Sequence, residues 1–125
     1  MELAIFFKSV LDQDTSPVVL CDLDHKIIYM NKSADEHYSK YGGHSLVGKN
    51  LLNCHTPQAK DKIVRTLEWF AKSKSHNIIY EFRNDEENKD VYTVALRDDD
   101  GELIGYYEKH VYRDKETAKL FDYSD

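Results

Sequence analysis

The sequence predicts one α+β domain built on an antiparallel sheet. Short runs rich in β-branched and aromatic residues lie on both sides of a central helical block, at about residues 18–30 and 78–112. Strands gathered in runs, with helices between the runs, are typical of α+β architecture. The length of 125 residues fits a single domain, and 41% hydrophobic with 32% charged residues is an ordinary globular balance.

The first element is a predicted helix that ends before the segment Asp14 to Pro17. Its apolar residues recur at spacings of three and four, which places them in one stripe: Leu3, Phe6, Phe7, Val10 and Leu11. A stripe indicates burial but not the surface that buries it. Two alternatives therefore stay open, a helix packed on its own domain and a helix packed on a second copy of the chain.

A β-hairpin and a short helix follow. Residues 18–22 and 27–30 are apolar runs separated by the polar turn 23–26, a pattern typical of a hairpin. Asn31 comes directly after the second run and predicts the N-cap of a helix from Lys32 to Tyr38. The glycines Gly42, Gly43 and Gly48 then interrupt regular structure.

The longest predicted helix starts at Pro57, with Thr56 as its cap and proline at the first helical position. Its expected apolar face comprises Ala59, Ile63, Leu67, Phe70 and Ala71. Three predicted strands complete the domain, at residues 78–83, 91–96 and 103–112, with the acidic turn 98–101 before the last. Loops this short join antiparallel neighbours.

Three segments in this order resemble the PAS domain family. Residues 18–31 read VVLCDLDHKIIYMN, like the family's opening hairpin; residues 47–51 read VGKNL, like the segment before its long helix. Residues 97–105 read RDDDGELIG, like its final turn. The resemblance covers residues 14–113, which leaves an amphipathic helix at 1–13 and a tail at 114–125. It implies a PAS fold with a five-stranded antiparallel sheet, helices on one face, and a space between them that some members fill with a cofactor and others with side chains.

One bacterial subgroup of the family, often found beside hemerythrin-like domains, carries a Cys-His-Pro-Pro segment. The segment Cys54-His55-Thr56-Pro57 is similar to it, with Thr56 in place of the first proline. His55 is a candidate haem ligand because an imidazole beside the expected cavity could ligate haem iron as a proximal His does, although haem-binding PAS sensors use a His within the long helix. The alternative is that His55 bonds to backbone and orients that helix.

Cys54 is the second cofactor candidate. Light-sensing PAS domains bind flavin beside a cysteine in an Asn-Cys-Arg-Phe-Leu-Gln segment, which this chain matches only at Asn53, Cys54 and Gln58. We therefore do not expect flavin, and the thiol is better read as a small apolar group. Haem stays open as a cofactor, and the cofactor is otherwise unknown.

Tyrosines on the predicted strands are the remaining cavity candidates: Tyr80, Tyr92 and Tyr107, with Tyr106 beside them. Such side chains either pack the sheet or give a ligand cavity polar tips, since buried tyrosine hydroxyls need partners. The six histidines show no HxxH or HxxxH spacing, so no metal site is expected beyond His55 with haem. No phosphate loop or nucleophile elbow is present, so we expect no enzyme.

The charge pattern restricts the partners. The formal net charge is −6 and the basic residues are scattered, which argues against nucleic acid and anionic membranes. The sequence shows no signal peptide, no membrane-length apolar run and only two cysteines, and we predict a cytoplasmic protein. The predicted function is a sensory module that binds a small ligand and signals as a homodimer to a partner protein in trans. The alternatives are a ligand-free dimerisation domain with a filled core and a haem-based redox or gas sensor.

Overall fold

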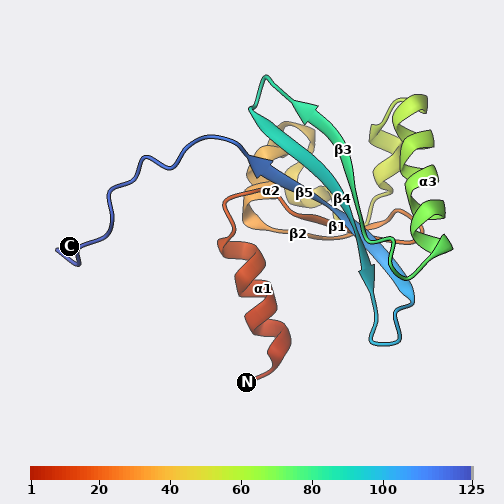
Figure 1. The fold of residues 1–125 in the computed structure, drawn as a ribbon, viewed down its shortest axis with the longest axis horizontal. Helices are drawn as coiled ribbons and strands as arrows, with labels where there is room; N and C mark the ends of the chain where they lie inside the picture. The colour runs from red at the N-terminus through yellow and green to blue at the C-terminus, as the bar shows by residue number, and fades with distance from the viewer. Residues whose placement is uncertain (125) are drawn as a thin grey trace.

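The computed structural model describes residues 1–124, apart from the side chain of Cys54. Its centre is a five-stranded antiparallel sheet in the order β2-β1-β5-β4-β3, with helices packed on one face (Figure 1). The strands are β1 (Val19–Asp22), β2 (Ile27–Met30), β3 (Ile78–Asn84), β4 (Lys89–Arg97) and β5 (Leu103–Tyr112). The predicted α+β fold with one antiparallel sheet is confirmed.

The helices are α1 (Leu3–Gln13), α2 (Lys32–His37) and α3 (Pro57–Lys72). Three short 3₁₀ helices connect α2 to α3, namely η1 (Ser39–Tyr41), η2 (Gly43–Leu46) and η3 (Leu51–Cys54). Thr56 caps α3 as predicted, because its hydroxyl accepts a hydrogen bond from the Ala59 amide at 3.2 Å. Pro57 stands at the start of the helix, where its missing N–H costs nothing.

The pairing of β1 with β5 joins the two halves of the chain. Cys21 lies opposite Tyr106 in this pair, so the opening hairpin and the last three strands form one sheet. The two strands approach so closely that a Cβ on Gly105 would lie 2.2 Å from the carbonyl oxygen of Cys21. Only glycine fits at that position without a shift of the backbone.

Asn31 joins α1, β1 and α2. Its side chain is fully buried, and its Oδ1 accepts from the amides of Val18 and Ala34, each at 2.9 Å. Its Nδ2 donates to the carbonyl oxygens of Leu11 at 2.7 Å and Ser16 at 3.0 Å. The predicted N-cap of α2 is confirmed, and the same residue also holds the end of α1.

The hydrophobic core lies between the sheet and the helices that cover it. It comprises Cys21, Ile27, Met30, Ala34, Ile63, Phe70 and Tyr106. On α3 the expected face is nearly right, with Ile63 and Phe70 buried and Leu67 half-buried. Thr66 is buried where Ala71 was expected, and its hydroxyl donates to the Lys62 carbonyl oxygen at 2.8 Å, which satisfies that polar group.

Helix α1 projects away from the sheet, and none of its residues is buried (Figure 1). Leu3, Phe6, Phe7 and Val10 are all more than half exposed. Packing of this stripe on its own domain, one of the two alternatives above, is therefore absent from the single chain. Among the described residues, no helix combines the length and the apolar character that crossing a membrane requires.

Candidate functional site: a cavity between the sheet and the helices

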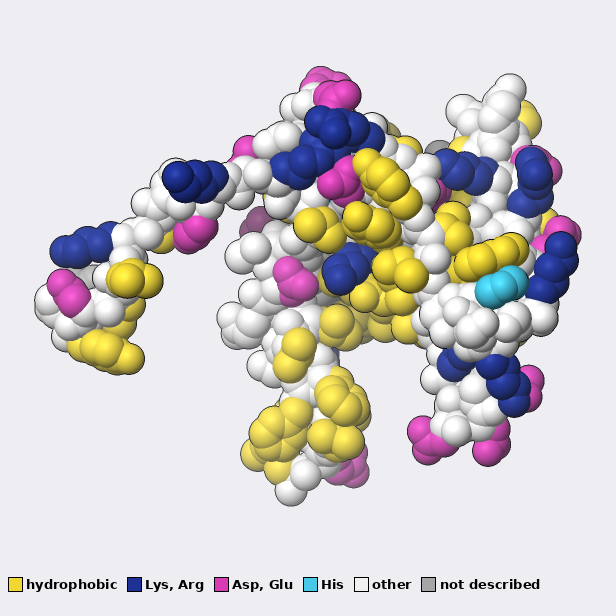
Figure 2. Space-filling model, viewed as in Figure 1, with side chains coloured by type: hydrophobic (Ala, Val, Ile, Leu, Met, Phe, Trp, Pro, Cys, Tyr) yellow, Lys and Arg dark blue, Asp and Glu magenta, His cyan; other side chains and the backbone are white. Residues whose placement is uncertain are grey.

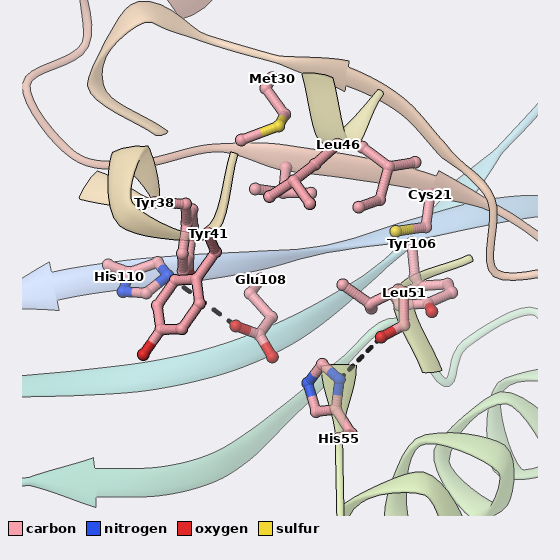
Figure 3. Close-up of a pocket in the computed structure, with 12 residues that line it drawn as sticks. Cys21, Met30, Tyr38, Tyr41, Leu46, Leu51, His55, Tyr106, Glu108 and His110 are labelled. Carbon is pink, nitrogen blue, oxygen red and sulfur yellow. Dashed lines mark hydrogen bonds and ion pairs between the residues drawn. The ribbon is translucent and has the colours of Figure 1, made fainter. Parts of the chain in front are cut away.

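A cavity of about 320 Å³ lies between the inner face of the sheet and the segment from α2 to η3. This size is at the lower end of the range for small-molecule sites. Its walls come from β1, β2 and β5 on one side and from the connecting segment on the other (Figure 3). The lining residues are Val19, Cys21, Ile27, Met30, Tyr38, Tyr41, Leu46, Leu51, His55, Tyr106, Glu108 and His110.

Most of the lining is apolar, and the Cys21 thiol and the Tyr106 hydroxyl in it are neutral. Burial raises the pKa of the Cys21 thiol to about 12, so this cysteine stays protonated. Burial also raises the pKa of Tyr106, whose hydroxyl shares a hydrogen bond of 2.9 Å with Nδ1 of His25. Met30, Leu46 and Leu51 complete this part of the wall. It offers an apolar surface to the larger part of a bound molecule.

Glu108 supplies the acidic group of the cavity. Burial, and next the negative charge of Glu81, raise the pKa of Glu108 to about 7, while Lys89 and Lys62 act in the opposite direction. Glu81 lies on β3 and accepts a hydrogen bond of 2.5 Å from the Thr93 hydroxyl. Glu108 therefore changes its charge near neutral pH and is the side chain most able to respond to a ligand.

His110 stands two residues further along β5, with Nε2 3.9 Å from Oε2 of Glu108. Its side chain is 6% exposed, and Nδ1 has no hydrogen-bond partner within the described part of the chain. Burial, together with the charges of Lys89 and His37, lowers the pKa of His110 to about 4. The imidazole is therefore neutral at neutral pH and adds no positive charge to the cavity.

His55 lines the cavity from the loop before α3. Its Nδ1 donates to the Leu51 carbonyl oxygen at 2.8 Å, since a carbonyl can only accept. That bond assigns the ring proton to Nδ1 and leaves Nε2 as a free acceptor, on the side of the ring that faces Glu108 in Figure 3. One nitrogen therefore bonds to backbone, as one of the two readings expected, and the role of the other nitrogen in holding a ligand stays a prediction.

Haem fits this lining poorly. A free Nε2 on His55 suits an axial ligand, because metal-bound histidines commonly donate their other ring N–H to a carbonyl. Haem also carries two propionate groups, however, and no Lys or Arg is present among the described residues that line the cavity. Glu108 would add a further negative charge beside those groups. Within the described residues, no three His, Cys, Asp or Glu side chains are grouped to hold a metal ion.

The three predicted strand tyrosines lie on the opposite face of the sheet. Tyr106 points to the cavity, so its neighbour Tyr107 points away from it, and the register with β4 and β3 places Tyr92 and Tyr80 on that outer face too. Tyr80 stacks on Tyr92 there, with ring centroids 5.2 Å apart. The prediction that these three tyrosines line the cavity is therefore corrected. The Cys54 side chain lies outside the described residues.

Sequence reasoning missed Glu108, His110 and Tyr38. The first two follow Tyr106 at intervals of two along β5, which places all three on one face of the strand. The alternation of side chains along the strand was visible in the sequence, but the sequence did not show which of the two alternating sets faces the cavity. Tyr38 ends the α2 segment, and Tyr41, 65% exposed, stands beside it at the edge of the cavity.

Comparison with known proteins assigns the family. The profile of the PAS fold family matches residues 11–110. The C-terminal domain of a Streptococcus mutans protein is similar at 25% identity and a TM-score of 0.65, over 87% of this chain and 83% of that one. A PAS domain from Colwellia psychrerythraea is 14% identical, with a TM-score of 0.64 over 89% of this chain and 97% of that one.

A third similar structure is the Aer2 receptor from Vibrio cholerae, described as a dual PAS-heme oxygen sensor. It is 18% identical, with a TM-score of 0.52 over 76% of this chain and 91% of that one. No curated protein matches the sequence. The family profile does not distinguish the subgroup with the Cys-His-Pro-Pro segment, so membership of that subgroup stays a prediction. The profile match over most of the chain, together with the observed sheet and helices, shows that the chain belongs to the PAS fold family.

Proposed function

We propose that this chain is a cytoplasmic sensory module that binds a small ligand in the cavity and passes the change to a partner protein. PAS domains are in general sensory modules without catalytic activity, and similar folds occur in a Vibrio cholerae sensor histidine kinase and in the Bordetella pertussis protein BvgS. The proposed role is binding and signalling, with no enzymatic step.

The single observation that carries this proposal is the cavity itself. A dimerisation domain with a filled core would close this space with side chains, since protein interiors pack to nearly crystalline density. Here about 320 Å³ stays free between the sheet and the segment from α2 to η3, with a polar end formed by Glu108, His110 and His55. Ligand binding therefore accounts for the cavity better than a filled core does, and it accounts for the half-buried carboxyl of Glu108 at its wall.

The route from the cavity to the surface runs through β2. Met30 lines the cavity, and the next residue, Asn31, holds the carbonyl of Leu11 at the end of α1. A ligand that displaces Met30 would therefore disturb the attachment of α1. The apolar stripe of α1, formed by Leu3, Phe6, Phe7 and Val10, is the surface through which we propose that two copies associate (Figure 2).

The proposed dimer interface continues onto the outer face of the sheet. Ile78, Tyr80 and Ile104 are each about half exposed, and Figure 2 shows hydrophobic side chains gathered across the sheet as well as on α1. The two apolar surfaces would together form one interface, with the signal passing in trans from the dimer to a further protein.

The decisive experiment is mass spectrometry of the purified protein after denaturation. A small molecule released in about equimolar amount supports the proposal, and absorbance of the native protein identifies a coloured ligand such as haem or flavin. A protein that releases nothing, and whose melting temperature no member of a small-molecule library raises, contradicts ligand sensing and favours the filled-core alternative.

Sedimentation velocity tests the proposed dimer separately. Phe6→Glu places a charge in the apolar stripe and should convert the dimer to a monomer at micromolar concentration. Ser9→Glu adds the same charge on the polar side of α1 and should leave the dimer intact. A wild-type monomer at high concentration, unchanged by Phe6→Glu, refutes assembly through α1.

A further inference from the structure

The charge and the hydrogen-bonding groups of the cavity restrict the class of ligand. No Lys or Arg is found among the described lining residues, and the one charged group on the wall is the Glu108 carboxyl. His110 is neutral at neutral pH, and His55 presents a lone pair at Nε2 because its ring proton is on Nδ1, which donates to the Leu51 carbonyl oxygen. The polar end thus offers two acceptors, one of them negatively charged, together with the single N–H that neutral His110 carries. The nearest cations, Lys89 and Lys62, do not line the cavity and are paired elsewhere: Lys89 with Glu87 at 2.7 Å, and Lys62 with the Glu81 carbonyl oxygen.

Both acceptors line the same cavity. Figure 3 shows Glu108 and the free side of His55 projecting toward the same part of the cavity, from β5 and from the loop before α3. The Tyr38 ring lines the same end, and the face of an aromatic ring attracts a cation. The apolar remainder, with Met30 and Leu46, suits a hydrocarbon or aromatic tail.

We propose that the cavity is a site for a small amphiphilic amine, whose protonated nitrogen donates to Glu108 and to Nε2 of His55 while its apolar tail lies along Met30 and Leu46. The inference rests on the proposed function and adds the class of ligand to it. A carboxylate or phosphate ligand would face Glu108 without a compensating positive charge, and burying unpaired like charges is strongly unfavourable.

Three compounds of matched shape test the ligand class: 4-phenylbutylamine, 4-phenylbutan-1-ol and 4-phenylbutyrate. Each is titrated by calorimetry into protein that has been unfolded in urea and refolded, so that the cavity is emptied first. The titrations are made at pH 8, where Glu108 is ionised and the amine is still protonated, and at 150 mM NaCl to screen the net negative charge of the chain. We expect the amine to bind at least tenfold more tightly than the alcohol, and the butyrate not to bind.

The variants assign the preference to the named residues. Glu108→Gln keeps the size of the side chain, removes its charge, and should reduce amine affinity at least tenfold while leaving alcohol affinity unchanged. Glu86→Gln removes a carboxylate from an exposed turn and serves as the matched control, with no expected effect on either compound. His55→Ala should weaken the amine more than the alcohol.

The outcomes separate this inference from the proposed function. Three outcomes overturn the amine class and leave ligand sensing intact. The butyrate binds as tightly as the amine, Glu108→Gln keeps the preference for the amine over the alcohol, or an anion co-purifies with the protein. If the amine does not bind, the amine class fails. The proposed function fails as well only if mass spectrometry also finds no released molecule and no member of the small-molecule library raises the melting temperature.

Discussion

Replacing Asn31 by alanine should strongly destabilise the domain. The side chain is fully buried, and it makes four hydrogen bonds, two accepted from the amides of Val18 and Ala34 and two donated to the carbonyls of Leu11 and Ser16. Alanine removes all four, and it leaves the Val18 amide without its partner inside the protein. The change also deletes the N-cap of α2.

The size of the effect follows from these contacts. A hydrogen bond contributes about 1 kcal/mol net, and loss of an N-cap alone costs about 1 kcal/mol. Water reaches part of the broken network, since the Leu11 and Ser16 carbonyls lie near the surface, so the four losses do not add in full. We expect the free energy of unfolding to fall by about 3 kcal/mol, a large share of the roughly 5–15 kcal/mol typical of a domain.

Urea unfolding followed by tryptophan fluorescence and by circular dichroism measures this change. The midpoint should drop while the slope with urea stays the same, because the surface exposed on unfolding is unchanged. Asn53→Ala is the control, since Asn53 is exposed in η3, and we expect a change below about 0.5 kcal/mol. A loss below about 1 kcal/mol in Asn31→Ala would refute the view that Asn31 joins α1, β1 and α2.

Three further predictions concern Arg97, Glu108 and His55. Arg97 donates to the carbonyl of Phe70 in the last turn of α3 and to those of Ser73 and His76 after it, so Arg97→Met should lower the free energy of unfolding by about 3 kcal/mol. Exposed Arg65→Met should change it little, and equal effects of the two variants contradict this prediction. Folding raises the pKa of Glu108 from 4.5 to about 7, because the folded protein favours its neutral form. The contribution of Glu108 to the free energy of unfolding is therefore fully present below pH 4.5 and is lost as the pH rises to 7. In urea unfolding experiments, the free energy of unfolding of Glu108→Gln relative to wild type should therefore rise by up to about 3 kcal/mol between pH 4.5 and 7. A difference between the two proteins that does not change with pH contradicts the raised pKa. Hemin titration should give no Soret band that depends on His55; a band lost in His55→Ala would reverse the conclusion about haem.

Local signals in the sequence predicted most of the fold. Thr56 with Pro57, and Asn31 before Lys32, mark helix starts because a cap bonds only to residues two or three positions away. The alternating strands and the turn before Leu103 likewise depend on neighbours in the chain. Such signals are complete within a few residues, so the sequence alone was sufficient to find the elements and their order.

The cavity depends on contacts between distant parts of the chain. Tyr106 and Tyr107 are equivalent in a strand pattern, and only the pairing of β5 with β1 shows that Tyr106 faces inward, bonded to His25 at a separation of 81 residues. The same inward phase places Glu108 and His110 in the wall and moves Tyr80 and Tyr92 to the outer face.

The sequence by itself determined the elements, their order and the helix caps, because each of these rests on short-range hydrogen bonds and side-chain periodicity. The tertiary structure alone decided which face of the sheet is enclosed, which carboxyl lines the cavity, and that the stripe of α1 stays uncovered in one chain. The physical reason is that burial, and the pKa shifts that follow from it, depend on the atoms that other segments bring near, and a periodic pattern has no information about those segments.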